Sequence, residues 1–241
     1  MMLLLANGCS HTSGAELEFE MQNDCYEKAW PFHLANNLEF ESLNLSSSGA
    51  SADRVVRTTI EYFLKKQSES DFDPKQYFVV IAWPGLYRTE INNGGFDGGW
   101  QPLVVGNDKT YKKQLDTFSY AYYKAWTIFA KEQSQTISYF HNILLLQYFL
   151  VSNKIKYLFW SASATTPYSM DYLDLYQNQI YKKRFPFLMD QAYSFTQLCH
   201  NNGQKISEYS KLSGFNSHYD EDAHKWFAGY IYDYIQENNL L

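Results

Sequence analysis

Short apolar runs alternate along this chain with longer segments in which apolar residues recur every three to four positions. The short runs predict buried β-strands, because a strand covered on both faces needs no polar alternation. The longer segments predict amphipathic helices. Strands are expected at residues 2–6, 41–45, 77–83 and 155–160, with a weaker one at residues 204–207. Since strands alternate with helices, we predict a three-layer α/β/α fold, flavodoxin-like, around a parallel sheet of about five strands.

Four helices are expected to cover this sheet. The first follows Trp30-Pro31, where proline suits the first helical position, and the second follows Ser51. A long helical pattern over residues 121–153, broken near Ser134, carries the largest apolar surface and is expected to be core. The last helix is expected at about residues 221–237.

One excursion interrupts the alternation. Residues 92–108 are rich in glycine and asparagine, so an excursion at the rim of the sheet is expected at about residues 86–118. No Lys-Ser or Lys-Thr pair follows the last glycine, which argues against a phosphate loop for nucleoside triphosphates. No linker rich in proline, glycine or serine divides the chain, and we predict a single domain over residues 1–241.

Composition and charge narrow the classes of function. The net charge of −6 and the scattered basic residues argue against a nucleic-acid binder. The three cysteines have no Cys-x-x-Cys spacing, so neither a disulfide framework nor a metal site is predicted, and no cofactor is expected. The apolar start is too short for a signal peptide, and residues 137–151 are too short and too polar to span a membrane. We therefore expect a cytoplasmic protein; the sequence does not indicate its oligomeric state.

The pattern that suggests chemistry follows the first predicted strand, where residues 7–14 read Asn-Gly-Cys-Ser-His-Thr-Ser-Gly. Ser10 is thus expected at the carboxyl end of a parallel strand, where helix N-termini favour developing negative charge. A serine nucleophile needs a base within hydrogen-bond reach. His218, in a loop just ahead of the last helix, suits that role. Two simpler interpretations stay open: Ser10 and Thr12 as helix caps, and His218 as an exposed loop residue.

These motifs resemble, in chain order, those of the SGNH (GDSL-type) hydrolases. The Gly-Asp-Ser block of that family is similar to residues 8–10, which makes Ser10 the implied nucleophile. The second block, an asparagine at a strand end followed by a loop glycine, resembles residues 44–51. The resemblance implies that the N–H groups of Ser10 and Gly49 form the oxyanion hole. The final block resembles the segment around His218, which inherits the role of base.

Three positions depart from the family pattern. Cys9 replaces the aspartate that precedes the serine. The third block, normally Gly-x-Asn-Asp, reads Ala-Trp-Pro-Gly at residues 82–85, so one oxyanion donor is missing, a loss that typically costs about 10²–10³ in rate. Phe215 stands where the family has an aspartate, and Asn216 is the neighbouring residue that could orient the His218 ring.

Other residues at the rim complete the expected site. His11, Trp83 and Arg88 are the candidate substrate-binding residues. Arg88 can bind a substrate carboxylate or form a structural ion pair with Glu90, and the ion pair is favoured. A shifted register is an alternative, in which His224, with an acid three residues before it, is the base.

The expected function is a serine ester hydrolase that acts through an acyl-serine intermediate on a small-molecule or carbohydrate ester. Aromatic residues make up 18% of the chain and can supply surfaces that stack on sugars. One alternative is a catalytically impaired module of the same fold that binds carbohydrate or a protein surface. Another is a phosphate cradle formed by Ser10, Thr12, Ser13 and Gly14, in which His218 would be dispensable.

Overall fold

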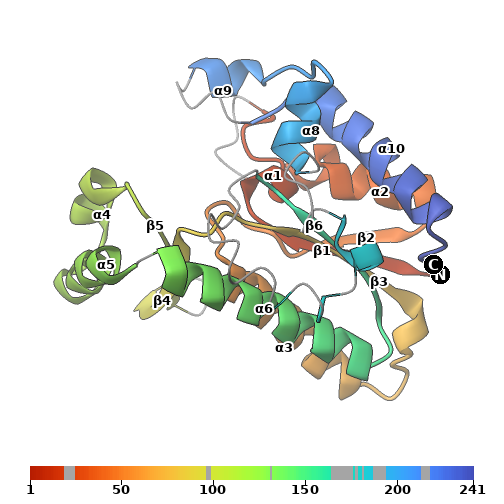
Figure 1. Ribbon diagram of the computed structural model, residues 1–241, viewed down its shortest axis with the longest axis horizontal. Helices are drawn as coiled ribbons and strands as arrows, with labels where there is room; N and C mark the ends of the chain where they lie inside the picture. The colour runs from red at the N-terminus through yellow and green to blue at the C-terminus, as the bar shows by residue number, and fades with distance from the viewer. Residues whose placement is uncertain are drawn as a thin grey trace.

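The computed structural model describes residues 1–18, 25–95, 99–130, 132–163, 176, 179–180, 182–186, 194–212 and 218–241. Its centre is a parallel sheet with the strand order β2-β1-β3-β6 (Figure 1). The strands are β1 (Leu3–Gly8), β2 (Glu41–Asn44), β3 (Tyr77–Trp83) and β6 (Lys156–Ser161). The predicted α/β fold with a parallel sheet is therefore confirmed.

The described residues place four strands in this sheet instead of about five. Residues 204–207, the weakest strand prediction, contribute only an isolated antiparallel bridge between Ile206 and Tyr219. This segment is short and polar, so it lacks the apolar run that buries the other strands. The register is set by the central strand, where Leu5 aligns with Leu43 on one side and with Val79 on the other.

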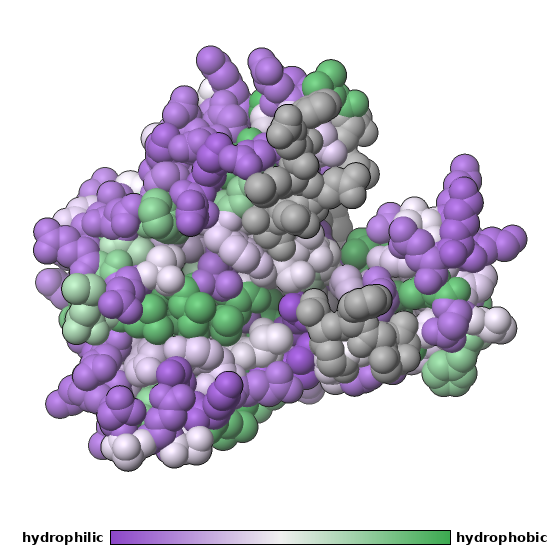
Figure 2. Space-filling view, turned by 180° about the vertical axis from the view of Figure 1, so that it is seen from behind, coloured by the Kyte–Doolittle hydropathy of each residue, from purple (hydrophilic) through white to green (hydrophobic). Residues whose placement is uncertain are grey.

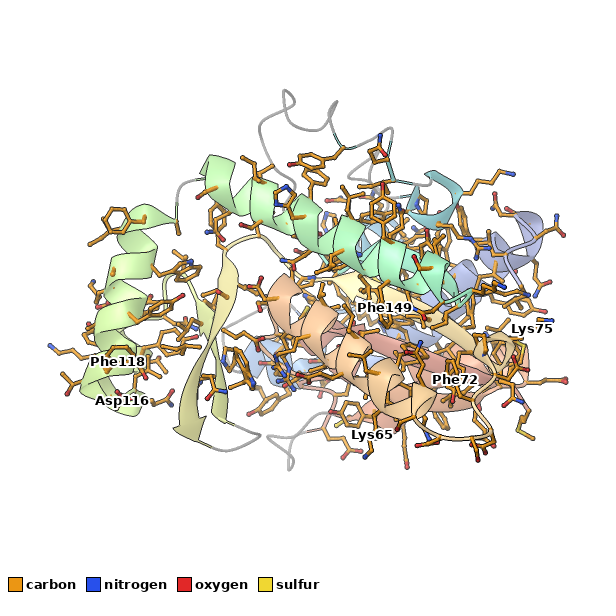
Figure 3. The ribbon with its side chains drawn as sticks, turned by 90° about the horizontal axis from the view of Figure 1, so that it is seen from below. Lys65, Phe72, Lys75, Asp116, Phe118 and Phe149 are labelled. Carbon is orange, nitrogen blue, oxygen red and sulfur yellow. The ribbon has the colours of Figure 1, made fainter. Side chains whose placement is uncertain are left out.

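Alternate residues of the strands face two separate cores. On one face, Leu4 and Ala6 pack in a cluster with residues of α2 (Trp30–Leu38), α8 (Phe195–Asn201) and α10 (Glu221–Glu237). On the other, Leu5 packs in a cluster with residues of α3 (Ala52–Gln67) and α6 (Glu132–Ser152). Figure 3 shows α3 and α6 side by side, where Phe63 and Phe149 have ring centroids 6.5 Å apart. The sheet is thus a buried middle layer.

The excursion expected at about residues 86–118 forms a small lobe. It contains an antiparallel hairpin, β4 (Arg88–Gly95) with β5 (Gly99–Val104), and the helices α4 (Asp108–Gln114) and α5 (Thr117–Phe129). A separate apolar cluster of Ile91, Leu103, Tyr111 and Tyr123 stabilises it. Figure 2 shows this rim lobe projecting at the right of the molecule, with apolar patches on its surface.

The long helical pattern divides earlier than expected. α5 ends at Phe129 and α6 begins at Glu132, before the break predicted near Ser134. The prediction that the whole pattern is core is wrong for α5, because Ile128 and Phe129 are more than two-thirds exposed. α6 does face the core. Among the described residues, no helix has both the length and the apolarity needed to cross a membrane.

Short helical segments connect these elements. They are α1 (Ser10–Ser13), η1 (Tyr26–Lys28), η2 (Pro74–Gln76), η3 (Lys182–Arg184) and α9 (Glu208–Leu212). Of these, α1 follows the central strand β1 and α9 precedes His218, so both help to build the rim at the carboxyl ends of the strands.

Candidate active site

Ser10 lies at the carboxyl end of β1, in a tight turn. It is the first residue of α1, it follows Cys9 in extended conformation, and it is 9% exposed. The turn requires glycine at position 8, because a β-carbon there would collide with Thr12 Oγ1 and lie 2.7 Å from the carbonyl oxygen of Ala82. Gly14, with a φ of 75°, ends the helical turn. The sequence thus holds the serine at the rim of the sheet.

The loop after β2 is bonded to this serine turn. The Asn44 side chain donates from Nδ2 to the carbonyl oxygen of Thr12 at 2.8 Å. The Ser47 N–H donates to the carbonyl oxygen of Gly8 at 3.3 Å. Gly49 follows with a φ of 78°, a left-handed conformation that favours glycine. These bonds place the loop that carries Gly49 next to the turn that carries Ser10.

His218 is brought to the same turn from the far end of the sequence. Its N–H donates to Ser210 Oγ at 3.1 Å, and its carbonyl oxygen accepts from the N–H of Ser207 at 2.9 Å. Its ring lies beside that of His11, with centroids 4.8 Å apart. Because His11 follows Ser10 directly, the loop that carries His218 lies next to the turn that carries Ser10.

Glu16 is the acidic partner of His218. The two side chains, each 15% exposed, meet with 2.8 Å between His218 Nδ1 and Glu16 Oε2. A carboxylate oxygen accepts hydrogen bonds, so Nδ1 is the donor in this pair and Nε2 is the ring nitrogen left to act as a base. Glu16 has a φ of 64°, a left-handed conformation that costs a non-glycine residue about 1–2 kcal/mol.

Sequence reasoning missed Glu16. The expected partner of His218 was a residue close to it in the sequence, and Asn216 was predicted to orient the ring. Asn216 lies outside the described residues. Glu16 is 202 positions away from His218. The signal in the sequence was weak: a carboxylate two residues after the glycine that ends the serine turn.

His11 is a buried, neutral histidine beside the candidate base. It is 8% exposed, and its ring also lies 5.5 Å from that of Phe195. Burial holds the pKa of His11 well below its ordinary value, and the nearby His218 and Arg88 lower it further. His11 therefore stays uncharged near neutral pH and does not compete with His218 for a proton.

The other two predicted binding residues have different outcomes. The Trp83 ring is fully buried and packs against Tyr139 and Phe159, with centroids 6.1 and 5.3 Å away, so it is not open to a ligand. Arg88 is partly exposed and donates from Nη1 to the carbonyl oxygen of Ala50 at 3.4 Å. This carbonyl belongs to the residue after Gly49.

The ion pair expected between Arg88 and Glu90 is not formed. Glu90 instead accepts two bonds from Arg57, with 2.9 Å from Nε to Oε1 and 2.9 Å from Nη2 to Oε2. Residues two positions apart in a strand, such as Arg88 and Glu90, point to the same face of the sheet. The Glu90 carboxylate nevertheless bonds to Arg57, which α3 brings to it. Within the described part of the chain, Arg88 forms no ion pair, and its charge is available to a ligand.

His224 has a structural role in α10. Its Nδ1 accepts a hydrogen bond of 3.1 Å from the N–H of Trp30, and its ring is buried. Burial, with smaller effects from His218 and His33, lowers the pKa of His224 to about 3. Glu221, the acid of the shifted register, pairs with Lys225 at 2.7 Å instead. This geometry does not support the alternative in which His224 is the base.

Because His224 is buried, the folded protein is expected to become less stable against unfolding in acid. The unfolded chain protonates His224 near pH 6.5 and the folded chain near pH 3, so the unfolded state binds more protons between these values. The free energy of unfolding is expected to fall between pH 6.5 and 4, by up to about 1.4 kcal/mol per pH unit for this residue. Urea unfolding at pH 7 and pH 5 measures it. His224→Asn, which keeps an acceptor for the N–H of Trp30, is expected to make the free energy of unfolding depend less on pH. His200→Asn is the exposed control and is expected to keep the wild-type pH dependence. Equal pH dependence in the wild type and in His224→Asn would contradict the assignment.

The Glu16–His218 pair thus lies beside the turn of Ser10 at the carboxyl edge of the sheet. Among the residues that the structure describes, no group of three or more His, Cys, Asp or Glu side chains could hold a metal ion.

A model of the family described as "Family of unknown function (DUF6071)" matches residues 16–191, more than half of the chain. The chain belongs to the DUF6071 family. The match includes Glu16, Gly49 and Arg88, whereas Ser10 precedes its start and His218 follows its end. A search of curated proteins found no match for this DUF6071 protein.

Solved structures show which fold the DUF6071 protein has. The crystal structure of TesA matches 98% of this chain and 99% of its own, with a TM-score of 0.50 at 10% identity. The acetyl xylan esterase Est2A from the rumen bacterium Butyrivibrio proteoclasticus also has a TM-score of 0.50, at 11% identity, over 98% of this chain and 64% of its own. A putative lipolytic protein of the G-D-S-L family from Desulfitobacterium hafniense matches with a TM-score of 0.46 and 14% identity, over 97% of this chain and 99% of its own. At such identities the likeness is one of fold, and that fold is the one of the SGNH hydrolases, as the sequence motifs predict.

Proposed function

We propose that this DUF6071 protein is a serine ester hydrolase that acts through an acyl-serine intermediate. The observation that carries the proposal is the Glu16–His218 pair beside the turn of Ser10. A serine becomes a nucleophile when a base accepts its proton and a third group orients that base. In this proposal two segments supply the three roles: the turn after β1, which carries Ser10 and Glu16, and the loop of His218, which is about 200 positions away in the sequence.

The chemical steps follow from the protonation of His218. Ser10 Oγ attacks the acyl carbon, and its proton passes to Nε2 of His218. The Glu16 carboxylate holds the Nδ1 proton and stabilises the imidazolium that forms. His218 then gives the Nε2 proton to the leaving alcohol oxygen. Water attacks the carbonyl carbon of the acyl-serine and passes a proton to Nε2, and the bond to Ser10 breaks as Nε2 returns that proton to Ser10 Oγ and the carboxylic acid leaves.

The oxyanion hole is proposed to use the N–H groups of Ser10 and Gly49. Ser10 begins α1, where N–H groups lack partners within the helix. The segment after β3, which carries an asparagine in the SGNH pattern, contains Pro84, which has no N–H to donate. We assign Arg88 and His11 to substrate binding, since Arg88 reaches the carbonyl next to Gly49 and His11 lines the cluster around His218.

An activity-based probe tests this proposal. A fluorophosphonate reacts only with an activated serine, so the wild-type protein is expected to be labelled at Ser10 and to hydrolyse p-nitrophenyl acetate or butyrate. Peptide mass spectrometry identifies the labelled residue. A folded protein that is neither labelled nor active on these esters would overturn the hydrolase assignment and favour a binding module of the same fold.

Glu16→Gln is expected to lower kcat by about 10³–10⁴ with little change in KM, because glutamine fits the site but does not fix the Nδ1 proton or stabilise the imidazolium. Steady-state kinetics on a p-nitrophenyl ester measure the effect. Glu18→Gln is the matched control, since Glu18 pairs with Lys28 at the surface. A Glu16→Gln enzyme within threefold of wild type would show that Glu16 has no catalytic role.

A further inference from the structure

A cavity lies at the amino end of β6, at the edge of the sheet opposite to the edge that carries Ser10. Its volume is about 270 Å³, close to the lower end of the range of roughly 300–1,000 Å³ typical of small-molecule sites. The end of α6, the start of β6 and η3 form its walls. The lining residues are Val151, Lys154, Ile155, Lys156, Tyr157 and Arg184.

The charged groups of this cavity are all cationic. Lys154, Lys156 and Arg184 line it, and no carboxylate does. Within the described ranges, none of the three forms an ion pair with an acidic side chain. The whole chain carries a net charge of −6, so this cavity is a local reversal of the charge of the protein. Three uncompensated cations around one space favour an anionic ligand.

Arg184 is held in position before any ligand binds. Its Nη1 donates to the carbonyl oxygens of Tyr157 and Leu240, at 2.8 and 3.0 Å. Its guanidinium lies 5.7 Å from the centroid of the Tyr157 ring. A guanidinium fixed in this way loses little side-chain entropy on binding, and its planar group of donors suits the oxygens of a phosphate or carboxylate.

The end of α6 adds to the fit. Lys154 has a φ of 58°, and its N–H donates to the carbonyl oxygen of Val151 at 3.0 Å. The N–H of Ile155 donates to the carbonyl oxygen of Leu150 at 2.9 Å. These bonds satisfy carbonyl groups of the last helical turn. The negative end of the α6 dipole disfavours an anion, and the three cations of the cavity oppose this effect. The side chains of Val151 and Ile155 give the cavity an apolar wall.

We propose that this cavity binds a phosphate monoester, with the phosphate between Lys154, Lys156 and Arg184 and the organic group against Val151 and Ile155. A dianionic phosphate gains more from three cations than a single carboxylate does. The apolar wall distinguishes a monoester from inorganic phosphate. This site is separate from the proposed catalytic centre, and it does not depend on ester hydrolysis.

Titration calorimetry with phenyl phosphate tests the site. Wild type is expected to bind saturably, with an affinity that falls as sodium chloride is raised. Lys154→Gln/Lys156→Gln is expected to bind at least tenfold more weakly. The matched control is Lys109→Gln/Lys112→Gln, which removes the same charge from exposed positions on α4, in the rim lobe. Phenol, which lacks the phosphate, is not expected to bind.

Amide chemical shifts locate the bound ligand, and changes are expected in residues 151–157. Melting temperatures of both double variants verify that they are folded. The absence of saturable binding to wild type, an equal loss in both double variants, or shift changes confined to other residues would each overturn the proposal. Fluorophosphonate labelling of the lysine variant is expected to match wild type, so failure of the phosphate site is distinguishable from failure of the hydrolase assignment.

Discussion

Ser10→Ala is expected to lower kcat for ester hydrolysis by about 10⁵–10⁶ and to abolish fluorophosphonate labelling. The physical reason is that alanine removes the only atom that forms the acyl bond, while the turn around it is fixed by Gly8, Thr12 and Gly14 and does not require the hydroxyl. Steady-state kinetics on p-nitrophenyl acetate, with the melting temperature measured in parallel, separate loss of chemistry from loss of folding.

Ser13→Ala is the matched control for this variant. Ser13 lies in the same turn of α1, is buried, and donates from Oγ to the carbonyl oxygen of Ser10 at 3.3 Å. Its loss is expected to cost about 0.5–1.5 kcal/mol of stability and to leave labelling intact. If Ser10→Ala retained more than a hundredth of the wild-type kcat, Ser10 would not be the nucleophile.

His218→Gln is expected to reduce kcat by about the same factor as Ser10→Ala, since a nucleophile and its base act as a unit. Glutamine keeps a polar side chain near Glu16 but offers no nitrogen that accepts the serine proton. The double variant Ser10→Ala/His218→Gln is expected to be no slower than either single variant. This non-additivity, measured as kcat/KM for all three proteins, is the sharper sign that the two residues act in one step.

His200→Gln is the control for the histidine, because His200 is exposed on α8. The result also separates the hydrolase from the phosphate cradle around Ser10, which uses backbone N–H groups. In a cradle, His218→Gln would leave the function unchanged. A labelled and active His218→Gln protein would therefore contradict the proposed mechanism, even if Ser10 were essential.

The fold could be predicted because its signals are local. The four strong apolar runs of the sequence became the strands of the parallel sheet, and the segment after His218 leads into α10 as the periodicity predicts. The weak run at residues 204–207 became a single bridge, and α5 became part of the rim lobe. The strand prediction at residues 204–207 was therefore wrong, whereas the helix prediction for α5 was right about local conformation but did not show what would cover the helix.

The sequence by itself determined the strand that carries Ser10, the glycines that make its turn tight, and the placement of His218 ahead of the last helix. These depend on neighbouring residues and on a hydrophobic period that can be read from the chain. Only the tertiary structure decided that Glu16 meets His218, that Trp83 is packed in the core, and that Glu90 pairs with Arg57 and leaves Arg88 available. The physical reason is that the carboxyl ends of parallel strands meet at one edge of the sheet, so loops that are distant in the sequence become neighbours. The partner of each side chain is then set by distance in space, which no local sequence pattern encodes.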